Sequence, residues 1–304
     1  MKVFHNIAQD FRRNKVIYFL CIPIVLWYII FCYMPMGGIV IAFQNFTPAR
    51  GISGSPWVGA EHFIRFFTGP YAWRLIRNTF MLSLLDLLFN FPAPIIFALL
   101  LNEVYCKTFK KTIQTISYMP YFISLVVLCG IVVDFTKSGG VISSAVAAVT
   151  GTAPQNLLGN VKYFRTIYTV SSIWQGLGYG SIIYIAALSG IDPSLYEAAT
   201  VDGASKLQRI VNIDLPGILP TIIIQLIMQC GRLMNVGHEK VLLMQNNLNM
   251  SSSDIISTYV YRIGLENARY SFSAAVGMFN SVINTFLLIL VNTISRKVSE
   301  TSLW

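Results

Sequence analysis

Six runs of apolar residues, each long enough to cross a lipid bilayer as a helix, restrict this chain to few folds. The hydrocarbon core of a bilayer is about 30 Å thick, which an α-helix crosses in roughly 20 residues. Because no water satisfies backbone N–H and C=O groups there, only helices or closed barrels span it. The six runs are 16–43, 80–101, 113–135, 165–189, 217–236 and 272–294. We therefore predict an all-α integral membrane protein with about six transmembrane helices in a single domain, residues 1–304.

The composition agrees with a surface that faces lipid. Of the 304 residues, 55% are apolar and only 12% are charged, whereas soluble domains carry about 25% charged residues. The net charge of +9 does not indicate nucleic acid, because no basic helix or RNA-type aromatic motif accompanies it. In a membrane protein, Lys and Arg instead anchor the loops and attract anionic lipid headgroups.

The sequence gives no support for catalysis, metal binding or ATP binding by this chain itself. Its five cysteines form no CxxC pair and its three histidines are isolated, so no metal site is predicted. It also lacks the GxxxxGK[ST] pattern of a phosphate-binding loop. We expect no catalytic residue, no metal ligand and no cofactor.

Four local patterns carry structural predictions. Run 16–43 is too long for a signal-peptide core and lacks an A-x-A cleavage site, which favours a transmembrane helix over a cleaved signal. Segment 44–77 interleaves aromatic and basic residues, as short helices in the membrane interface do. Segment 136–164 predicts an external loop with a surface helix. Gly176 and Gly180 have GxxxG spacing, which predicts close packing of another helix.

The distribution of Lys and Arg predicts the orientation, because cytoplasmic loops of membrane proteins are enriched in both. If the N-terminus is cytoplasmic, the inside segments are 1–15, 102–112, 191–216 and 295–304. These segments hold half of the 22 Lys and Arg residues in about a fifth of the chain. Both tails and the polar segment between the fourth and fifth runs are therefore expected in the cytoplasm.

That polar segment, residues 191–216, predicts two short helices joined by an elbow. Asp192 can cap the start of the first helix. Gly203 is expected to break it, because glycine tolerates left-handed dihedral angles. The Ser205–Gln208 pair has the pattern of a capping box that starts the second helix, which Leu215-Pro216 is expected to end. Such a helix pair at a membrane surface is suited to binding by a partner protein.

The segment also contains a spaced motif. It reads Glu197-Ala198-Ala199, three residues, Gly203, nine residues, Ile213, one residue and Leu215-Pro216. This pattern resembles EAA-x3-G-x9-I-x-LP, the EAA signature of permease subunits of bacterial ABC importers, and every motif position is present. The residues 202–205, DGAS, are similar to a variant found in carbohydrate importers of the maltose-permease type.

Three further segments extend the resemblance over most of the chain. They are similar to a subgroup that handles complex oligosaccharides and polysaccharide fragments, which includes permeases of the LplB type and alginate-importer permeases. These segments are 112–124, 254–262 and 274–292. Chains of that subgroup commonly have His where this one has Tyr121, and Phe where it has His238.

The resemblance implies the type I ABC importer permease fold and a multi-pass place in the bacterial cytoplasmic membrane. It implies a second homologous permease, two ATP-binding subunits that hold ATP and Mg, and an extracytoplasmic solute-binding protein that delivers an oligosaccharide. In such complexes the EAA loop supplies a coupling helix that sits in a groove on the ATPase. The matching positions here are Glu197, Ala198, Ala199, Asp202 and Gly203.

Polar and aromatic residues inside the apolar runs are candidates for a substrate path. A saccharide needs amide or hydroxyl partners for its OH groups and aromatic faces for its C–H surfaces. Several candidates form i, i+4 pairs that share a helix face. The alternative role of such residues is hydrogen bonding between helices. The candidates are Trp174, Gln175, Tyr179, Tyr184, Gln225, Gln229, Asn280 and Asn284.

Asp86, inside the second run, is an intramembrane acid, and such acids usually face the bundle interior or a wet cavity. Its role stays open between a hydrogen bond joining two helices and a contact with substrate. An ion-coupled secondary transporter would need an inverted repeat and paired intramembrane acids, neither of which is evident here. A membrane sensor or scaffold that holds a cytoplasmic protein is the other alternative function.

Overall fold

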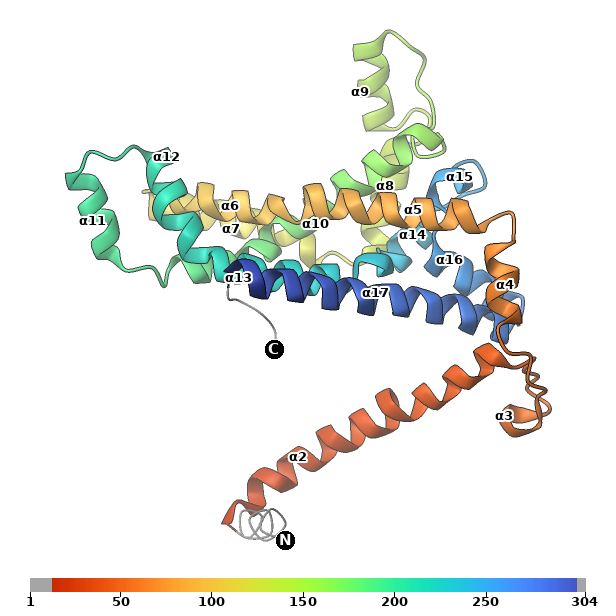
Figure 1. The fold of residues 1–304 in the computed structure, drawn as a ribbon. Helices are drawn as coiled ribbons and strands as arrows, with labels where there is room; N and C mark the ends of the chain where they lie inside the picture. The colour runs from red at the N-terminus through yellow and green to blue at the C-terminus, as the bar shows by residue number, and fades with distance from the viewer. Residues whose placement is uncertain (1–12, 300–304) are drawn as a thin grey trace.

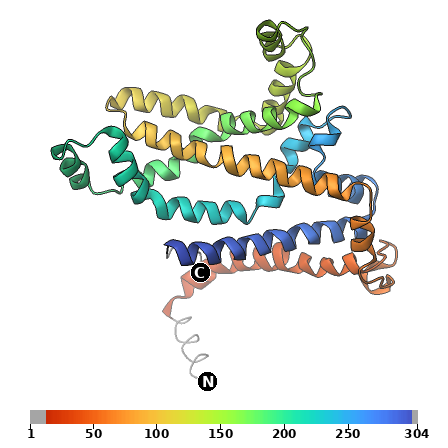
Figure 2. The ribbon, with the colours of Figure 1, turned by 45° about the horizontal axis from the view of Figure 1, so that its top comes forward.

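The computed structural model describes residues 13–299, and this part of the chain is helical (Figure 1). A bridge between Gln44 and Trp57 is the only β-type pairing among these residues. Long helices run through the body of the molecule and short ones gather at its two ends (Figures 1 and 2). Of the two predicted tails, residues 1–12 and 300–304 lie outside the described residues.

The first apolar run forms one helical segment of 29 residues, in which the helix type changes from α to π and then to 3₁₀. It consists of α2 (Lys15–Tyr28), the π-turn η1 (Ile29–Tyr33) and the 3₁₀ stretch η2 (Met34–Phe43). The end of this segment, η2, packs against α17 (Tyr270–Ser299). Toward its start, α2 diverges from the other helices, and none of its residues is buried (Figure 1).

The second run is likewise continuous over 31 residues. It joins α5 (Ala72–Leu85), the π-turn η3 (Asp86–Asn90) and α6 (Pro92–Asn102). Because proline donates no backbone hydrogen bond and its ring crowds the preceding turn, the wider π-turn lets the helix continue through Pro92.

The predicted interface segment 44–77 is partly helical in the expected way. It contains the short helices α3 (Gly51–Gly54) and α4 (Glu61–Phe67). Residues from Ala72 onward, however, belong to the first turns of α5. The second membrane segment thus begins earlier than its apolar run, since the amphipathic first turns bury Leu75 and Asn78 against the bundle.

The prediction of one unbroken helix over the third run, 113–135, is wrong. The structure has α7 (Lys107–Tyr118), a 3₁₀ turn η4 (Met119–Phe122) and α8 (Leu125–Thr136). Pro120 lies at the break and cannot continue the α-helical hydrogen bonding. The two halves therefore run as separate helices.

The surface helix predicted within 136–164 is present as α9 (Val141–Thr150), which stands off the bundle beyond α8 (Figure 1). Five helical segments of the described chain are long and apolar enough to cross a membrane. They are Lys15–Phe43, Ala72–Asn102, Leu125–Thr150, Lys206–Cys230 and Tyr270–Lys297. In the third of these, α8 belongs to the bundle and α9 stands off it (Figure 1); with the 28-residue α10 (Val161–Leu188), the segments account for about six membrane helices.

The central helix α10 packs against α6 and α7. A Cβ added to Gly180 would lie 3.1 Å from Pro94, so the close approach predicted there is real. A Cβ on Gly176 would meet nothing within 4 Å, and the tightest contact falls instead at Gly178, where it would lie 2.2 Å from the carbonyl oxygen of Ser117. The GxxxG prediction therefore holds for one of its two glycines.

The polar segment 191–216 folds as α11 (Pro193–Val201), α12 (Lys206–Arg209) and the π-turn η5 (Ile210–Asp214). The prediction that Leu215-Pro216 ends the second helix is wrong, because η5 runs directly into α13 (Leu215–Cys230). The wider π-turn η5 lies just before the proline and lets the helix continue through a residue that has no backbone N–H.

The chain then forms short elements before its last long helix. They are η6 (Leu233–Asn235), α14 (His238–Met244), α15 (Met250–Ser253), α16 (Ile256–Tyr261) and the π-turn η7 (Arg262–Glu266). α11 and α12 lie at one end of the bundle, whereas α4, α15 and α16 lie at the other (Figure 1). The last turns of α17 return to the end that carries α12.

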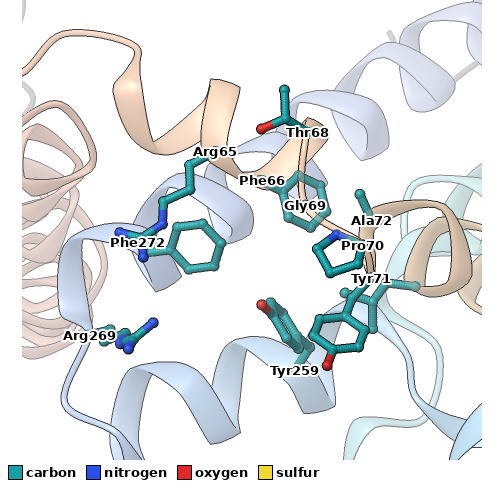
Figure 3. Close-up of a pocket in the computed structure, with 11 residues that line it drawn as sticks. Arg65, Phe66, Thr68, Gly69, Pro70, Tyr71, Ala72, Tyr259, Arg269 and Phe272 are labelled. Atoms are coloured by element: carbon teal, nitrogen blue, oxygen red, sulfur yellow. The ribbon is translucent and has the colours of Figure 1, made fainter.

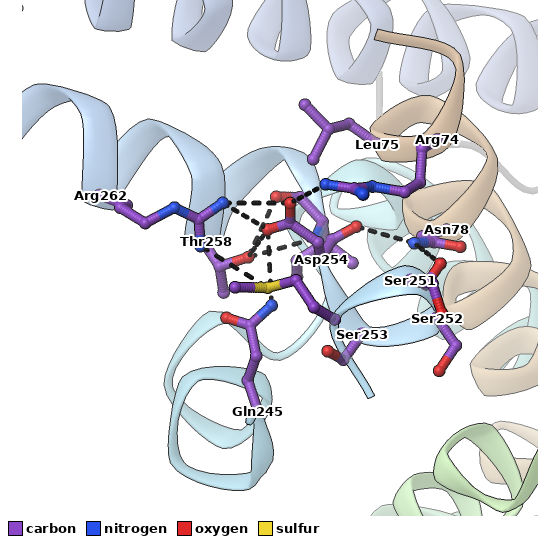
Figure 4. Close-up of polar contacts among 12 residues, drawn as sticks. Arg74, Leu75, Asn78, Gln245, Ser251, Ser252, Ser253, Asp254, Thr258 and Arg262 are labelled. Carbon is purple, nitrogen blue, oxygen red and sulfur yellow. Dashed lines mark hydrogen bonds and ion pairs between the residues drawn. The ribbon is translucent and has the colours of Figure 1, made fainter. Parts of the chain in front are cut away.

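A buried carboxylate stabilises the end that carries α15 and α16. Asp254 is fully buried and accepts hydrogen bonds from Arg74 Nη2 at 3.0 Å and from Arg262 Nη2 at 2.9 and 3.1 Å. Asn78 donates to its backbone oxygen at 3.0 Å and accepts from Arg165 Nη2 at 2.9 Å. Figure 4 shows how Arg74, Asn78, Asp254 and Arg262 join α5 to the segment around α16.

Asp254→Asn is expected to lower the free energy of unfolding by about 2 kcal/mol, because it removes the charge from two ion pairs. Thermal unfolding of the detergent-solubilised protein measures the change. Asp134→Asn is the matched control: its pair with Lys137, at 2.8 Å, joins side chains 67% and 60% exposed, and exposed pairs contribute little. Equal shifts for the two variants would contradict the stabilising role of Asp254.

Candidate functional site

The segment from α11 to α12, which carries the EAA motif, is capped as its sequence predicts. The Asp192 side chain accepts a hydrogen bond from Ser194 N at 2.9 Å, and this bond lowers the pKa of Asp192 below its ordinary value. Ser205 accepts from Gln208 N at 3.3 Å, and the Gln208 side chain accepts from Ser205 N at 2.7 Å. Side-chain hydrogen bonds therefore cap the N-terminus of each of the two helices.

The elbow between them depends on Gly203. Its φ is +70°, in the left-handed region that favours glycine. Two backbone hydrogen bonds close the turn: Gly203 N to Thr200 O at 3.1 Å and Ala204 N to Ala199 O at 2.8 Å. No atom lies within 4 Å of the position a Cβ would take, so the constraint comes from the backbone angle and not from crowding.

The motif residues leave a surface open. No residue of α11 is buried, and Glu197, Ala198 and Asp202 are exposed. Three apolar side chains of the same segment are also largely exposed: Leu195 at 50%, Val201 at 88% and Leu207 at 70%. A small-residue helix flanked by exposed apolar side chains is a surface suited to a protein partner.

The base of the segment is tied to the end of α6 by bonds that sequence reasoning missed. The fully buried Asp214 accepts hydrogen bonds from the Tyr196 hydroxyl and, at 3.3 Å, from Asn102 Nδ2. Arg209 Nη2 forms an ion pair with Glu103 at 3.3 Å. The bonds of Asn102 and Glu103 join the end of α6 to 191–216, and the bond of Tyr196 joins α11 to η5, so the segment is fixed to the membrane helices.

The Tyr196 hydroxyl is held in its neutral, donating form. Burial, and then the hydrogen bond to Asp214, raise the pKa of Tyr196 to about 12. The bond from α11 to the base of α13 is therefore present throughout the physiological pH range. No periodic pattern in the sequence pairs these two residues, which is why they were not predicted.

Asp86, whose role the sequence left open, lies at a junction of helices. It accepts hydrogen bonds from Asn90 Nδ2 at 2.8 Å and from the Gln229 side chain. The second bond joins η3 to α13. The sequence left two roles open for Asp86, a hydrogen bond between helices and a contact with substrate. The geometry fits the first of these roles.

The predicted path residues fall in several places. Tyr184, Gln225 and Gln229 line a cavity of about 200 Å³ between α6, α10 and α13. Tyr179 stacks on Tyr121 with ring centroids 3.7 Å apart, and Gln175 is half-buried. Trp174 lines an apolar hollow between α8 and α10.

The two asparagines of α17 take part in hydrogen bonds with η6. Asn284 Oδ1 accepts from Met234 N at 2.8 Å, and Asn280 Nδ2 donates to Asn235 Oδ1 at 2.6 Å. The other side-chain polar atom of each is buried without a hydrogen-bond partner. Both asparagines therefore join α17 to the segment after α13.

The largest of these cavities, about 560 Å³, lies along α16 and α17, and we refer to it as the α17 cavity. Three buried polar atoms without a hydrogen-bond partner belong to residues that line it: His238 Nδ1, Ser257 Oγ and Asn280 Oδ1. The ring of Tyr261, 5.6 Å from that of His238, adds an aromatic wall. Polar side chains and an aromatic wall around a cavity are a lining suited to a hydroxyl-rich ligand.

Comparison with known families decides what kind of protein carries these features. Residues 66–300 match the family described as binding-protein-dependent transport system inner membrane component. The chain belongs to this family. The matched range begins near the end of α4 and contains every long helix from α5 to α17 and the whole EAA segment.

Individual members of this inner membrane component family resemble the chain over nearly its full length. Protein LplB of Bacillus subtilis (strain 168) is 44% identical over 96% of this chain and 92% of its own. The polygalacturonan/rhamnogalacturonan transport system permease protein YteP of the same organism is 41% identical, over 96% and 91%. Each of these two alignments therefore covers more than nine tenths of both proteins.

The fold is also that of a solved member. A chain of a bacterial ABC transporter involved in the import of the acidic polysaccharide alginate superimposes with a TM-score of 0.89 at 39% identity. The match covers 97% of this chain and 99% of that one. The same values hold for a structure of the transporter in complex with an alginate pentasaccharide-bound periplasmic protein. The chain therefore has the type I ABC importer permease fold.

Proposed function

We propose that this chain is a transmembrane permease subunit of an ATP-driven importer for oligosaccharides or polysaccharide fragments. The observation that carries the proposal is the exposed EAA helix α11, which is tied through Asp214 to the membrane helices α6 and α13. The names of YteP and of the alginate transporter, both of which concern polysaccharides, support the choice of cargo.

Two ATP-binding subunits are the proposed partners of α11. Glu197 supplies a charge for a partner's donor, Ala198 and Ala199 allow close approach, and Asp202 and Gly203 form the elbow. Because α12, η5 and α13 form one continuous helical segment, a displacement of α11 by ATPase closure passes to the bundle as a rigid-body movement. ATP and Mg belong to those subunits and not to this chain.

A second permease and an extracytoplasmic binding protein complete the proposed complex. The unburied surface of α2 offers a large apolar face to lipid or to the second permease. The periplasmic protein bound to the alginate transporter is the model for delivery at the end with α4 and α16. The start of α2 and the end of α17 lie toward the α11 end (Figure 1). With both termini proposed to be cytoplasmic, the α11 end faces the inside of the cell.

The α17 cavity is the proposed part of the substrate path. Asn280, His238 and Ser257 line this cavity, and each carries a buried polar atom without a hydrogen-bond partner. The Tyr261 ring provides a face for sugar C–H groups. The predicted path residues Tyr184, Gln225 and Gln229 line a second, smaller cavity on another side of α13.

Reconstitution tests the proposal. A proteoliposome complex of this chain, its second permease and its ATP-binding subunits is expected to import oligosaccharide only with ATP and the loaded binding protein, and the loaded protein is expected to stimulate ATP hydrolysis. Import driven by an ion gradient without ATP would indicate a secondary transporter. Association with a cytoplasmic protein without import under either condition would indicate a scaffold.

A further inference from the structure

Two arginines from distant parts of the sequence converge on one cleft at the α4 end of the bundle. Arg65 belongs to α4, and Arg269 directly precedes α17. Both line a cleft of about 340 Å³ and an adjoining hollow of about 310 Å³. Figure 3 shows their side chains on the same side of the opening, across from Tyr71 and Tyr259. We refer to the two hollows together as the arginine cleft.

The positive charge of this cleft is uncompensated. Among the described residues, neither guanidinium forms an ion pair or a side-chain hydrogen bond. By contrast, Arg74 and Arg262 nearby both bind the buried Asp254. Because nearby like charges repel, a pair of free guanidinium groups in one cleft is a favourable site for an anion.

The backbone holds Arg269 in place. Ala268 has φ +52°, a left-handed angle that only this non-glycine residue adopts within residues 13–299. The backbone N–H of Arg269 donates to Ile263 O at 3.0 Å, which fixes the turn after η7. Backbone strain of this kind persists where the surrounding structure enforces it and is common at ligand sites.

The walls of the cleft suit a sugar ring. Tyr71, Tyr259 and Phe272 line it, and the ring of Tyr259 lies 6.3 Å from Phe272 and 6.5 Å from Tyr71. In the adjoining hollow, His62 is 92% buried; its Nε2–H donates to Gln44 O, 3.0 Å away, and its Nδ1 has no partner. Aromatic faces and a free polar nitrogen therefore surround the charged pair.

The cleft also adjoins the α17 cavity. Tyr270 lines both the hollow that contains Arg65 and Arg269 and the α17 cavity that contains Asn280. A ligand held at the arginines thus lies at the outer end of a row of cavities along α17. This row of cavities favours a ligand that passes along α17 over a site that only docks a folded protein.

We propose that the arginine cleft binds the carboxylate of a uronic acid unit, so that the transported oligosaccharide is acidic. Arg65 and Arg269 bind the carboxylate, and Tyr71, Tyr259 and Phe272 pack against the C–H faces of the sugar. The inference rests on the proposed import function and adds to it the chemical class of the cargo. An acidic side chain of the binding protein is the competing occupant, because the same charge would attract it.

The test uses the full complex in proteoliposomes with two probes, trigalacturonate and its carboxyl-reduced trigalactoside. The double variant Arg65→Gln/Arg269→Gln is expected to lower trigalacturonate uptake by about tenfold or more, chiefly through KM, because charge-assisted bonds are lost. Trigalactoside uptake and the affinity of the complex for the sugar-free binding protein are expected to stay at the wild-type level. Arg50→Gln, at an exposed arginine beside α3, is the matched control and is expected to change nothing.

Other results overturn the proposal in distinguishable ways. Unchanged trigalacturonate uptake by the double variant rejects the cleft as a carboxylate site. Equal loss for both probes, or a loss of affinity for the sugar-free binding protein, assigns the arginines to protein docking. A wild-type complex that imports only trigalactoside keeps the proposed function and rejects the acidic cargo. Uptake of neither probe rejects the galacturonate cargo, and a lack of ATP hydrolysis stimulated by the loaded binding protein would reject the proposed function as well.

Discussion

Gly203→Pro is expected to lower ATP-driven uptake by at least about tenfold without removing the protein from the membrane. Proline fixes φ near −65°, whereas Gly203 requires +70°. The variant also loses the backbone hydrogen bond to Thr200 O. The elbow must rearrange, and α11 then points away from its present direction. Because no residue of α11 is buried, the bundle itself is expected to stay folded.

The measurements are uptake into proteoliposomes, ATP hydrolysis stimulated by the loaded binding protein, and recovery of the ATP-binding subunits with the purified permease. Gly203→Asn is the matched control, because asparagine is enriched among the non-glycine residues that adopt left-handed angles. It is expected to keep most of the uptake. Wild-type uptake by Gly203→Pro would reject the role of the elbow in coupling.

Gly277→Trp is expected to block uptake, again by at least about tenfold, with ATP-binding subunits still attached. Gly277 lies on α17 and lines the α17 cavity. A Cβ there meets no atom within 4 Å, so the new side chain enters the cavity without displacing the backbone. An indole occupies part of the space of about 560 Å³ beside Asn280 and His238, and so narrows the cavity.

Gly130→Trp provides the matched control for bulk. Gly130 lies on α8, is exposed, and also has no atom within 4 Å of its added Cβ. Because it does not line the α17 cavity, the variant is expected to transport like the wild type. Equal inhibition by the two tryptophans, measured as initial uptake rate at equal protein amounts, would remove the α17 cavity from the path.

Local sequence signals predicted most helices of this fold. Apolar length gave the membrane segments, and capping residues gave the starts of α11 and α12. The errors lie at prolines: Pro120 divides the third run, whereas Pro216 is accommodated after a π-turn. A proline removes the same donor in both places, and only the surrounding packing decides between a break and a wider turn.

Polar residues inside the membrane were found by their position but not by their partners. The i, i+4 spacing placed Gln225 with Gln229 and Asn280 with Asn284 on common faces. In the fold, Gln229 binds Asp86 and Asn284 binds the backbone of Met234. Spacing along one helix gives no information about which neighbour its face meets, so the amount of free polar surface in each cavity could not be predicted.

The helical membrane fold and the position of the EAA segment can be predicted without a structure, because both follow from local properties: apolar length in a bilayer, and residue types at fixed spacing. The folded chain was needed to show that Asp214 anchors that segment to α6, that polar side chains line the α17 cavity, and that Arg65 and Arg269 share a cleft. These contacts join residues far apart in the chain, and their geometry depends on how each helix is rotated and packed against its neighbours.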